Sequence, residues 1–86
     1  MLQVSPLAAA RMAHLLNARP GHAVLRIVRQ NERLRLRLGI VRPGDQTFVH
    51  EGRVILAVDE RMGTKLTSRQ IELRETNAGP RLRLKR

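Results

Sequence analysis

Arginine and leucine alternate from position 33 to 38, with Gly39 and Ile40 continuing the pattern, and this spacing defines the clearest candidate binding surface in the sequence. On a β-strand, successive side chains point to opposite faces, so the arginines would share one face and the leucines the other. Alternate residues on a strand lie roughly 6.5–7 Å apart, which makes a line of cations suited to phosphate or carboxylate groups. A second alternation near the C-terminus adds two further cations. The candidate anion-binding or partner-binding residues are therefore Arg33, Arg35, Arg37, Arg81 and Arg83.

Three interpretations of this cationic face stay open. It is a solvated face of a basic protein, a surface for nucleic-acid phosphates, or a surface for an acidic protein partner. The chain has 17 Lys and Arg against 7 Asp and Glu, a formal net charge of +10. Proteins that bind single strands or RNA loops stack bases on aromatic side chains, and Phe48 is the one Phe, with no Tyr or Trp. Nucleic acid is therefore the less favoured partner.

Residues that could support catalysis or hold a metal are few and dispersed. The sequence contains no cysteine, which excludes disulfides, thiolate metal sites and thiol nucleophiles. His14, His22 and His50 have no metal-ligand spacing, so we expect them at the surface. Asp59 follows an apolar run, where we expect it to cap the next turn rather than to act as a catalytic acid. The sequence predicts a protein that is not an enzyme, with no catalytic residue, metal or cofactor.

A single helix is expected near the N-terminus to support these strands. Ser5 is typical of an N-cap and Pro6 of a first helical residue, and nothing breaks the helix before about Asn17. Residues 19–21, Arg-Pro-Gly, end it. The positions expected on its buried side are Ala8, Met12, Leu15 and Leu16.

The rest of the chain reads as short strands. The run 54–58 is apolar at every position, which indicates a central strand covered on both faces. The leucine side of residues 33–40 is expected to belong to the core, since it is the apolar face of a half-buried strand. Residues 60–66 favour a helical turn or an irregular connection, and residues 76–80 a loop. The remaining strands are expected at residues 1–4, 23–28, 47–50, 70–74 and 81–85.

Together these elements predict one α+β domain spanning residues 1–86. One N-terminal helix packs on a mainly antiparallel, two-layered β arrangement. The N-terminus has no positively charged region before an apolar run, and no segment approaches the ~20 apolar residues needed to cross a bilayer. We therefore expect a cytoplasmic protein that does not contact a membrane.

The order of these elements resembles the HesB-like domain of the A-type, or IscA-like, iron–sulfur cluster assembly proteins. Residues 4–11 (VSPLAAAR) look like the opening strand and helix of that family, and residues 25–27 (LRI) like its first hairpin strand. Residues 48–59 resemble its aromatic residue, glycine turn and valine-rich strand ending in Asp. Residues 66–73 (LTSRQIEL) and 77–79 (NAG) are similar to the segments that lead into its last hairpin. The resemblance implies a HesB-like β-sandwich.

This sequence departs from the family at the cluster ligands. The family holds its clusters through one cysteine after the first hairpin strand and a Cys-x-Cys pair near the C-terminus. Residues 30–32 here are Gln, Asn and Glu, and the chain stops at Arg86 before such a pair. Because thiolates hold these clusters, the resemblance implies a cysteine-free relative that binds a partner protein, with a homodimer left open. The alternative is a basic module that binds nucleic acid or another polyanion through the arginine face.

Overall fold

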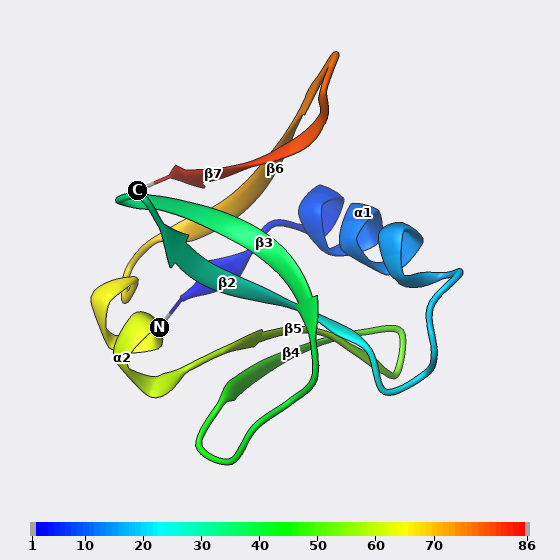
Figure 1. The fold of residues 1–86 in the computed structure, drawn as a ribbon, viewed down its shortest axis with the longest axis horizontal. Coiled ribbons are helices and arrows are strands. Elements are labelled where there is room, and N and C mark those ends of the chain that lie inside the picture. The colour runs from blue at the N-terminus through cyan, green and yellow to red at the C-terminus, as the bar shows by residue number, and fades with distance from the viewer. Residues whose placement is uncertain (1, 86) are drawn as a thin grey trace.

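The computed structural model describes residues 2–85, which fold into two β-sheets and two helices (Figure 1). The helices are α1 (Pro6–Leu16) and α2 (Glu60–Lys65). One sheet has the order β1-β6-β7, with β1 (Gln3–Val4), β6 (Gln70–Thr76) and β7 (Gly79–Lys85). The other has the order β3-β2-β5-β4, with β2 (Val24–Gln30), β3 (Arg33–Gly39), β4 (Gln46–His50) and β5 (Arg53–Val58). Within residues 2–85, no helix is long and apolar enough to span a bilayer.

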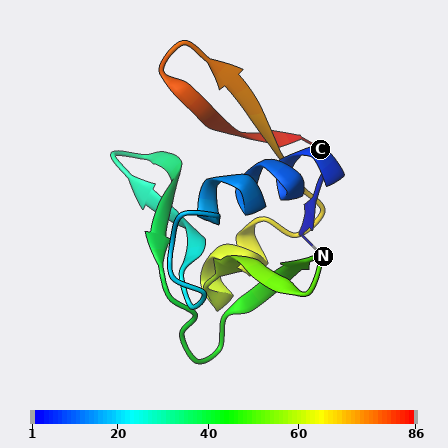
Figure 2. The ribbon, with the colours of Figure 1, turned by 90° about the vertical axis from the view of Figure 1, so that its right-hand side faces the viewer.

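Antiparallel hairpins supply most of the strand pairing. β2 with β3, β4 with β5, and β6 with β7 are antiparallel, whereas β1 pairs with β6 and β2 with β5 in parallel. α1 packs against both sheets, since it contacts β2, β4 and β5 of one and β6 of the other (Figure 2). The predicted class, α+β with an N-terminal helix on a mainly antiparallel two-layered β structure, is confirmed.

Helix α1 begins as the sequence predicts. The Oγ of Ser5 accepts a hydrogen bond from the N–H of Ala8 at 3.1 Å, and Pro6 is the first helical residue. This cap satisfies one of the N–H groups that have no partner at the start of a helix. Met12 and Leu16 are completely buried and Leu15 is half-buried, so the expected apolar side is the one that packs.

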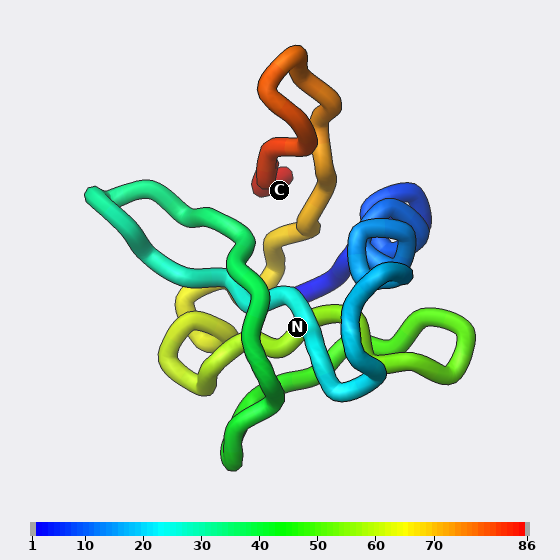
Figure 3. The backbone as a smooth tube through the Cα atoms, turned by 45° about the vertical axis from the view of Figure 1, so that its right-hand side comes forward, coloured from blue at the N-terminus to red at the C-terminus, as the bar shows by residue number. Residues whose placement is uncertain are grey.

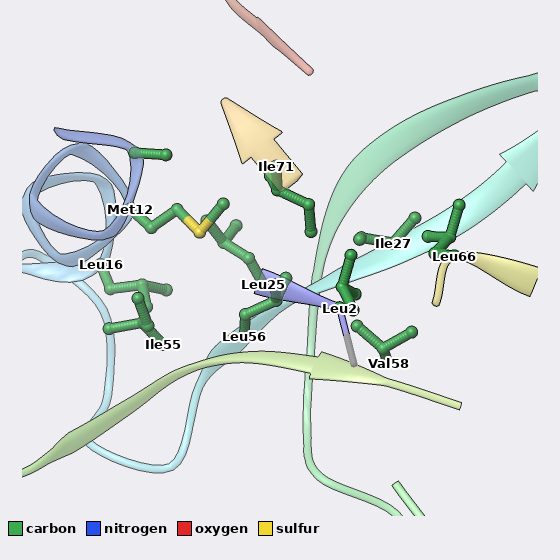
Figure 4. Packing of buried hydrophobic residues seen from close by; sticks show 11 residues of the cluster. Leu2, Met12, Leu16, Leu25, Ile27, Ile55, Leu56, Val58, Leu66 and Ile71 are labelled. Atoms are coloured by element: carbon green, nitrogen blue, oxygen red, sulfur yellow. The ribbon is translucent and has the colours of Figure 1, made fainter. Parts of the chain in front are cut away.

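The core lies where α1 meets the two sheets (Figure 4). Its largest fully buried side chains come from β5, α1, β6 and the segment before β1. They are Leu2, Met12, Leu16, Ile55, Leu56, Val58 and Ile71. No aromatic side chain is among these fully buried residues, and Phe48 only packs half-buried against them, so the stability of the core depends mainly on close packing.

β5 is the central strand that the continuous apolar run predicts. Ile55–Val58 are buried, and β5 lies between β2 and β4. Asp59 follows and caps α2 by accepting the N–H of residue 62 at 2.8 Å, so its expected role as a cap is confirmed. At the other end of β5, Arg53 donates to the carbonyl oxygen of Leu16 at 3.2 Å, which also accepts the N–H of Arg19 at 3.0 Å, and so ties β5 to the end of α1.

The leucine side of β3 is less buried than the alternation predicts. Leu34 and Leu36 are half-buried, whereas Leu38 is 48% exposed and Ile40, just beyond the strand, is 53% exposed. β3 is an edge strand whose one pairing partner within residues 2–85 is β2, and their hairpin extends away from the body of the protein (Figure 3). The prediction that this whole face belongs to the core is therefore wrong, because the neighbouring elements cover only part of it.

Two-residue turns close both hairpins that extend from the body. The loop expected at residues 76–80 is shorter than predicted, because only residues 77–78 separate β6 from β7. Gly79 has φ +104°, a conformation that favours glycine, and its carbonyl oxygen accepts a hydrogen bond from Thr76 Oγ1 at 2.6 Å. Between β2 and β3, Asn31 and Glu32 have φ values of +51° and +64°, as a type I′ turn requires.

Candidate functional site

An open groove lies between β3 and β7, two edge strands that belong to different sheets. The strands are far apart in the sequence, but the β2–β3 and β6–β7 hairpins bring them into contact. The groove has a volume of about 820 Å³. Its lining, which we call the β3–β7 groove, consists of Arg33, Leu34, Arg35, Leu36, Arg37, Ala78, Pro80, Arg81, Leu82 and Leu84.

Four of the five arginines singled out in the sequence line this groove. Arg33, Arg35 and Arg37 enter from β3 and Arg81 from β7, whereas Arg83 is not part of the lining. All five side chains belong to exposed residues, and within residues 2–85 none of them forms an ion pair. Their charges are therefore available to an anionic ligand, although Arg37 also donates a hydrogen bond of 2.6 Å to the side chain of Gln30.

Leucines from both strands give the groove an apolar interior. The register places Leu36 opposite Ile27 of β2, and Leu82 opposite Leu73 of β6, so the leucine faces of the hairpins continue the core outward. These leucines are half-buried and pack against the core. The four are Leu34, Leu36, Leu82 and Leu84. The groove thus combines apolar surface with a border of four cations, and no carboxylate from residues 2–85 lines it.

A shielded ion pair between Arg26 and Asp45 fixes the end of β3, and the sequence pattern did not reveal it. Arg26 Nη1 donates to Asp45 Oδ2 and to the carbonyl oxygen of Ile40, the latter at 2.9 Å, and Nη2 donates to Asp45 Oδ1 at 3.2 Å. Asp45 also accepts the backbone N–H of Arg42 at 2.7 Å. These bonds tie both ends of the β3–β4 connection to β2. One signal was available, since Arg26 interrupts the apolar run 23–28 and a buried cation needs a carboxylate.

The hydrogen bonds between Arg26 and Asp45 also determine the charge states of these two groups, which lie next to Arg37 of the groove. The hydrogen bond from Arg26 is the main reason that the pKa of Asp45 is lowered, and it outweighs the opposite effect of burial. The same bond raises the pKa of Arg26. Both groups are therefore charged at neutral pH. Arg26 lies directly opposite Arg37 in the β2–β3 register, where two like charges repel, and Asp45 offsets that repulsion.

Replacing Gly39 by Ala should destabilise the protein by about 1–3 kcal/mol, because it overpacks this contact. A Cβ at position 39 would lie 2.7 Å from Arg26 Cδ, and the guanidinium cannot move without leaving Asp45. Gly21→Ala is the matched control, because a Cβ there meets nothing within 4 Å. We expect it to be neutral or to stabilise by up to about 1 kcal/mol. Urea unfolding followed by circular dichroism measures both variants, and equal values would contradict the close approach of Arg26 to Gly39.

Neither the histidines nor residues 30–32, which stand where the family has its first cysteine, come together as metal ligands among the residues described. His14 and His22 are exposed, as expected, whereas His50 is half-buried with its Nε2 4.0 Å from Glu51 Oε1. Residues 30–32 lie at the tip of the β2–β3 hairpin, and all three are exposed. Among the residues that the structure describes, no three His, Cys, Asp or Glu side chains gather as metal ligands.

Solved structures of two iron–sulfur proteins share the architecture of this chain. No protein-family model and no curated protein matches its sequence. Escherichia coli SufA, described as involved in the biosynthesis of iron–sulfur clusters, superposes with a TM-score of 0.72 at 19% identity, over 96% of this chain and 82% of SufA. IscA, solved with a 2Fe–2S cluster, superposes with a TM-score of 0.65 at 17% identity, over 98% of this chain and 83% of IscA. At these identities the superpositions establish the fold alone. They confirm the fold that the resemblance implied: this chain has the HesB-like fold of SufA and IscA.

Proposed function

We propose that this protein is a cysteine-free relative of the A-type iron–sulfur assembly proteins that binds a partner protein in the cytoplasm and catalyses no reaction. The observation that carries the proposal is the β3–β7 groove, where four arginines from two distant strands surround half-buried leucines. The shared fold with SufA and IscA supports the relationship. The absence of thiolates from the chain argues against a role in holding the cluster itself.

The chemistry of the groove favours an acidic polypeptide over a nucleic acid. A phosphate backbone would use the cations but would leave the leucines in contact with water. A polypeptide uses both, because protein interfaces combine an apolar centre with a polar rim. Nucleic acid is the second candidate, and the observation that favours it is the row of exposed cations Arg33, Arg35 and Arg37 in a chain of formal net charge +10.

Binding of polyglutamate and of duplex DNA, measured by fluorescence anisotropy across a salt series, tests the proposal. The test variant replaces Arg33, Arg35 and Arg37 by Gln. The matched control makes the same change in charge away from the groove, and its positions are Arg19, Arg61 and Lys65. We expect polyglutamate to bind the parent and the control alike, and to bind the test variant more weakly with a flatter salt dependence.

Each outcome of this titration has a defined meaning. If the test variant and the control bind polyglutamate equally, the arginine row is a solvated face and the proposal is wrong. If duplex DNA binds the parent more tightly than polyglutamate does, and only the test variant loses it, the nucleic-acid function replaces the partner-binding one. In that case the salt slope should fall by roughly the number of phosphate contacts removed. Neither variant should change stability by more than about 0.5 kcal/mol, because the altered residues are exposed.

The 86-residue chain should not acquire an iron–sulfur cluster. Anaerobic incubation with iron and sulfide, followed by desalting, is expected to leave a colourless protein, because no thiolate is present to hold iron. A cysteine-containing A-type protein treated in parallel is the positive control. A brown product with stoichiometric iron would contradict the proposal and would restore the cluster-carrying function.

A further inference from the structure

The outer edge of β3 has backbone groups without a strand partner among the residues described. β3 pairs only with β2, through the type I′ turn at Asn31 and Glu32. In such a hairpin the residues that flank the turn, Gln30 and Arg33, exchange backbone hydrogen bonds. Along β3 from Arg33, the backbone N–H and C=O groups of successive residues then point alternately toward β2 and away from it. The N–H and C=O groups directed away from β2 are therefore those of Leu34, Leu36 and Leu38.

The facing edge of β7 is less able to accept another strand. The same alternation starts from Thr76 and Gly79, so Pro80 is the first residue on the free edge. Proline has no N–H, and it commonly protects sheet edges from further pairing. Three donors follow one another at alternate positions along β3, whereas β7 offers only those of Leu82 and Leu84. β3 is therefore the edge available for pairing, and β7 forms the opposite side of the groove.

Resting on the function proposed above, we propose that the partner binds as an extended segment in which acidic and apolar residues alternate, and that this segment adds to the free edge of β3. The backbone of the segment would pair with the free groups of the three leucines. Its apolar side chains would lie on the leucine face between the two sheets, where Leu38 is 48% exposed, and would fill the groove toward Leu82. Addition of a strand to a sheet edge is an established mode of peptide recognition.

On its other face, the bound segment must carry side chains whose charge complements the arginines of β3. Its alternate side chains would lie beside Arg33, Arg35 and Arg37, where opposite charges across neighbouring strands stabilise pairing and like charges destabilise it. Acidic residues are therefore required at those positions. The same argument disfavours a second copy of β3, because its own arginines would lie against these three, and charged edge strands oppose such self-pairing.

Three synthetic peptides separate strand addition from simple attraction between charges. The first is a seven-residue peptide of alternating Glu and Val, which matches the seven residues of β3. The second has the same composition with Glu and Val in two blocks. The third is the alternating peptide with N-methyl groups on alternate residues, which removes the donors that would face β3. We expect the first to bind about tenfold more tightly than the other two, the difference that one or two backbone hydrogen bonds produce.

Amide hydrogen exchange of the protein gives a second readout, at single residues. The alternating peptide should slow exchange at the N–H groups of Leu34, Leu36 and Leu38, and should leave Arg35 and Arg37 unchanged because their N–H groups already bond to β2. Leu38→Pro removes one outward donor without disturbing the bonds to β2, so it should weaken binding of the alternating peptide but not of polyglutamate. Leu38→Ala controls for loss of the side chain.

The outcomes distinguish this inference from the function on which it rests. If polyglutamate binds through the arginines but the three peptides bind equally, or exchange at the leucine amides is unchanged, strand addition is wrong and acidic partner binding stands. If the leucine amides of the free protein become protected as its concentration rises, the edge is occupied by a second copy, and the inference is also wrong. If neither polyglutamate nor the alternating peptide binds, both proposals fail.

Discussion

Replacing Asp45 by Asn should lower the free energy of unfolding by about 3 kcal/mol, because it leaves Arg26 shielded from water without a counter-charge. The side chains of Arg26 and Asp45 are 11% and 3% exposed. Asn keeps the size of the side chain, so the loss reports charge and hydrogen bonding rather than a cavity. Urea unfolding measures the change. Asp59→Asn is the matched control, since Asn is also a good helix cap, and we expect it to change stability by less than about 0.5 kcal/mol.

The pH dependence of the same pair gives an independent check. Because the pKa of Asp45 is lower in the folded than in the unfolded protein, its stabilisation is fully present above its unfolded pKa of about 3.9. It is lost as the pH falls through the lower pKa of the folded state. The difference in stability between the parent and Asp45→Asn should therefore be constant near neutral pH and should shrink below about pH 4. A difference that does not change down to pH 2 would contradict the ion pair.

Leu56→Ala is expected to cost about 2–5 kcal/mol, the usual penalty for a cavity in a packed core. Leu56 lies on the central strand and is completely buried. Leu36→Ala should cost only about 1 kcal/mol, since its side chain is half-buried at the edge strand and loses less apolar contact. Urea midpoints of the two variants, which share the same chemical change, measure the contrast. Equal losses would mean that the leucine face of β3 is as deeply buried as the sequence pattern suggested.

Charged substitutions at the same two positions sharpen this comparison. Leu56→Asp should abolish the folded state, because a carboxylate without a partner would be buried in the core. Leu36→Asp should give a folded but weakened domain, since that side chain can reach water along the open groove. The far-ultraviolet circular dichroism spectra of the two proteins decide the point, and an unfolded Leu36→Asp variant would contradict the exposed setting of β3.

The features that the sequence predicted correctly depend on neighbours along the chain. Ser5 and Pro6 mark the start of α1, the run at residues 54–58 gives the central strand, and Asp59 caps α2, each from a pattern within a few residues. Such patterns reflect local hydrogen bonding and side-chain periodicity, which are visible without knowledge of the fold. The order of the predicted elements carries the resemblance to a known family and hence to the HesB-like fold, which the superposition on SufA confirms.

What the sequence could not reveal depends on contacts between distant segments. The alternation at residues 33–40 identifies an apolar face, but only the strand order shows that β3 lies at an edge and leaves Leu38 exposed. In the same way, the sequence marks the arginines of β3, Arg81 and Arg83 as one candidate set, but only the packing of two hairpins shows that Arg81 shares a groove with the arginines of β3 and that Arg83 is outside its lining. Arg26 and Asp45 are 19 residues apart, and no local pattern joins them.

The parallel pairing of β1 with β6 has a consequence for how the chain folds as it is synthesised. The N–H of Gln3 donates to the carbonyl oxygen of Arg69 at 3.0 Å, and the N–H of Ser5 to that of Ile71 at 2.9 Å. The residues of β1 must therefore wait for the residues near position 70 before their strand can form. Closing so long a loop is entropically costly, which slows folding. The β2–β5 part can assemble earlier, and Leu2, a core residue next to β1, stays accessible to chaperones until β6 has been synthesised.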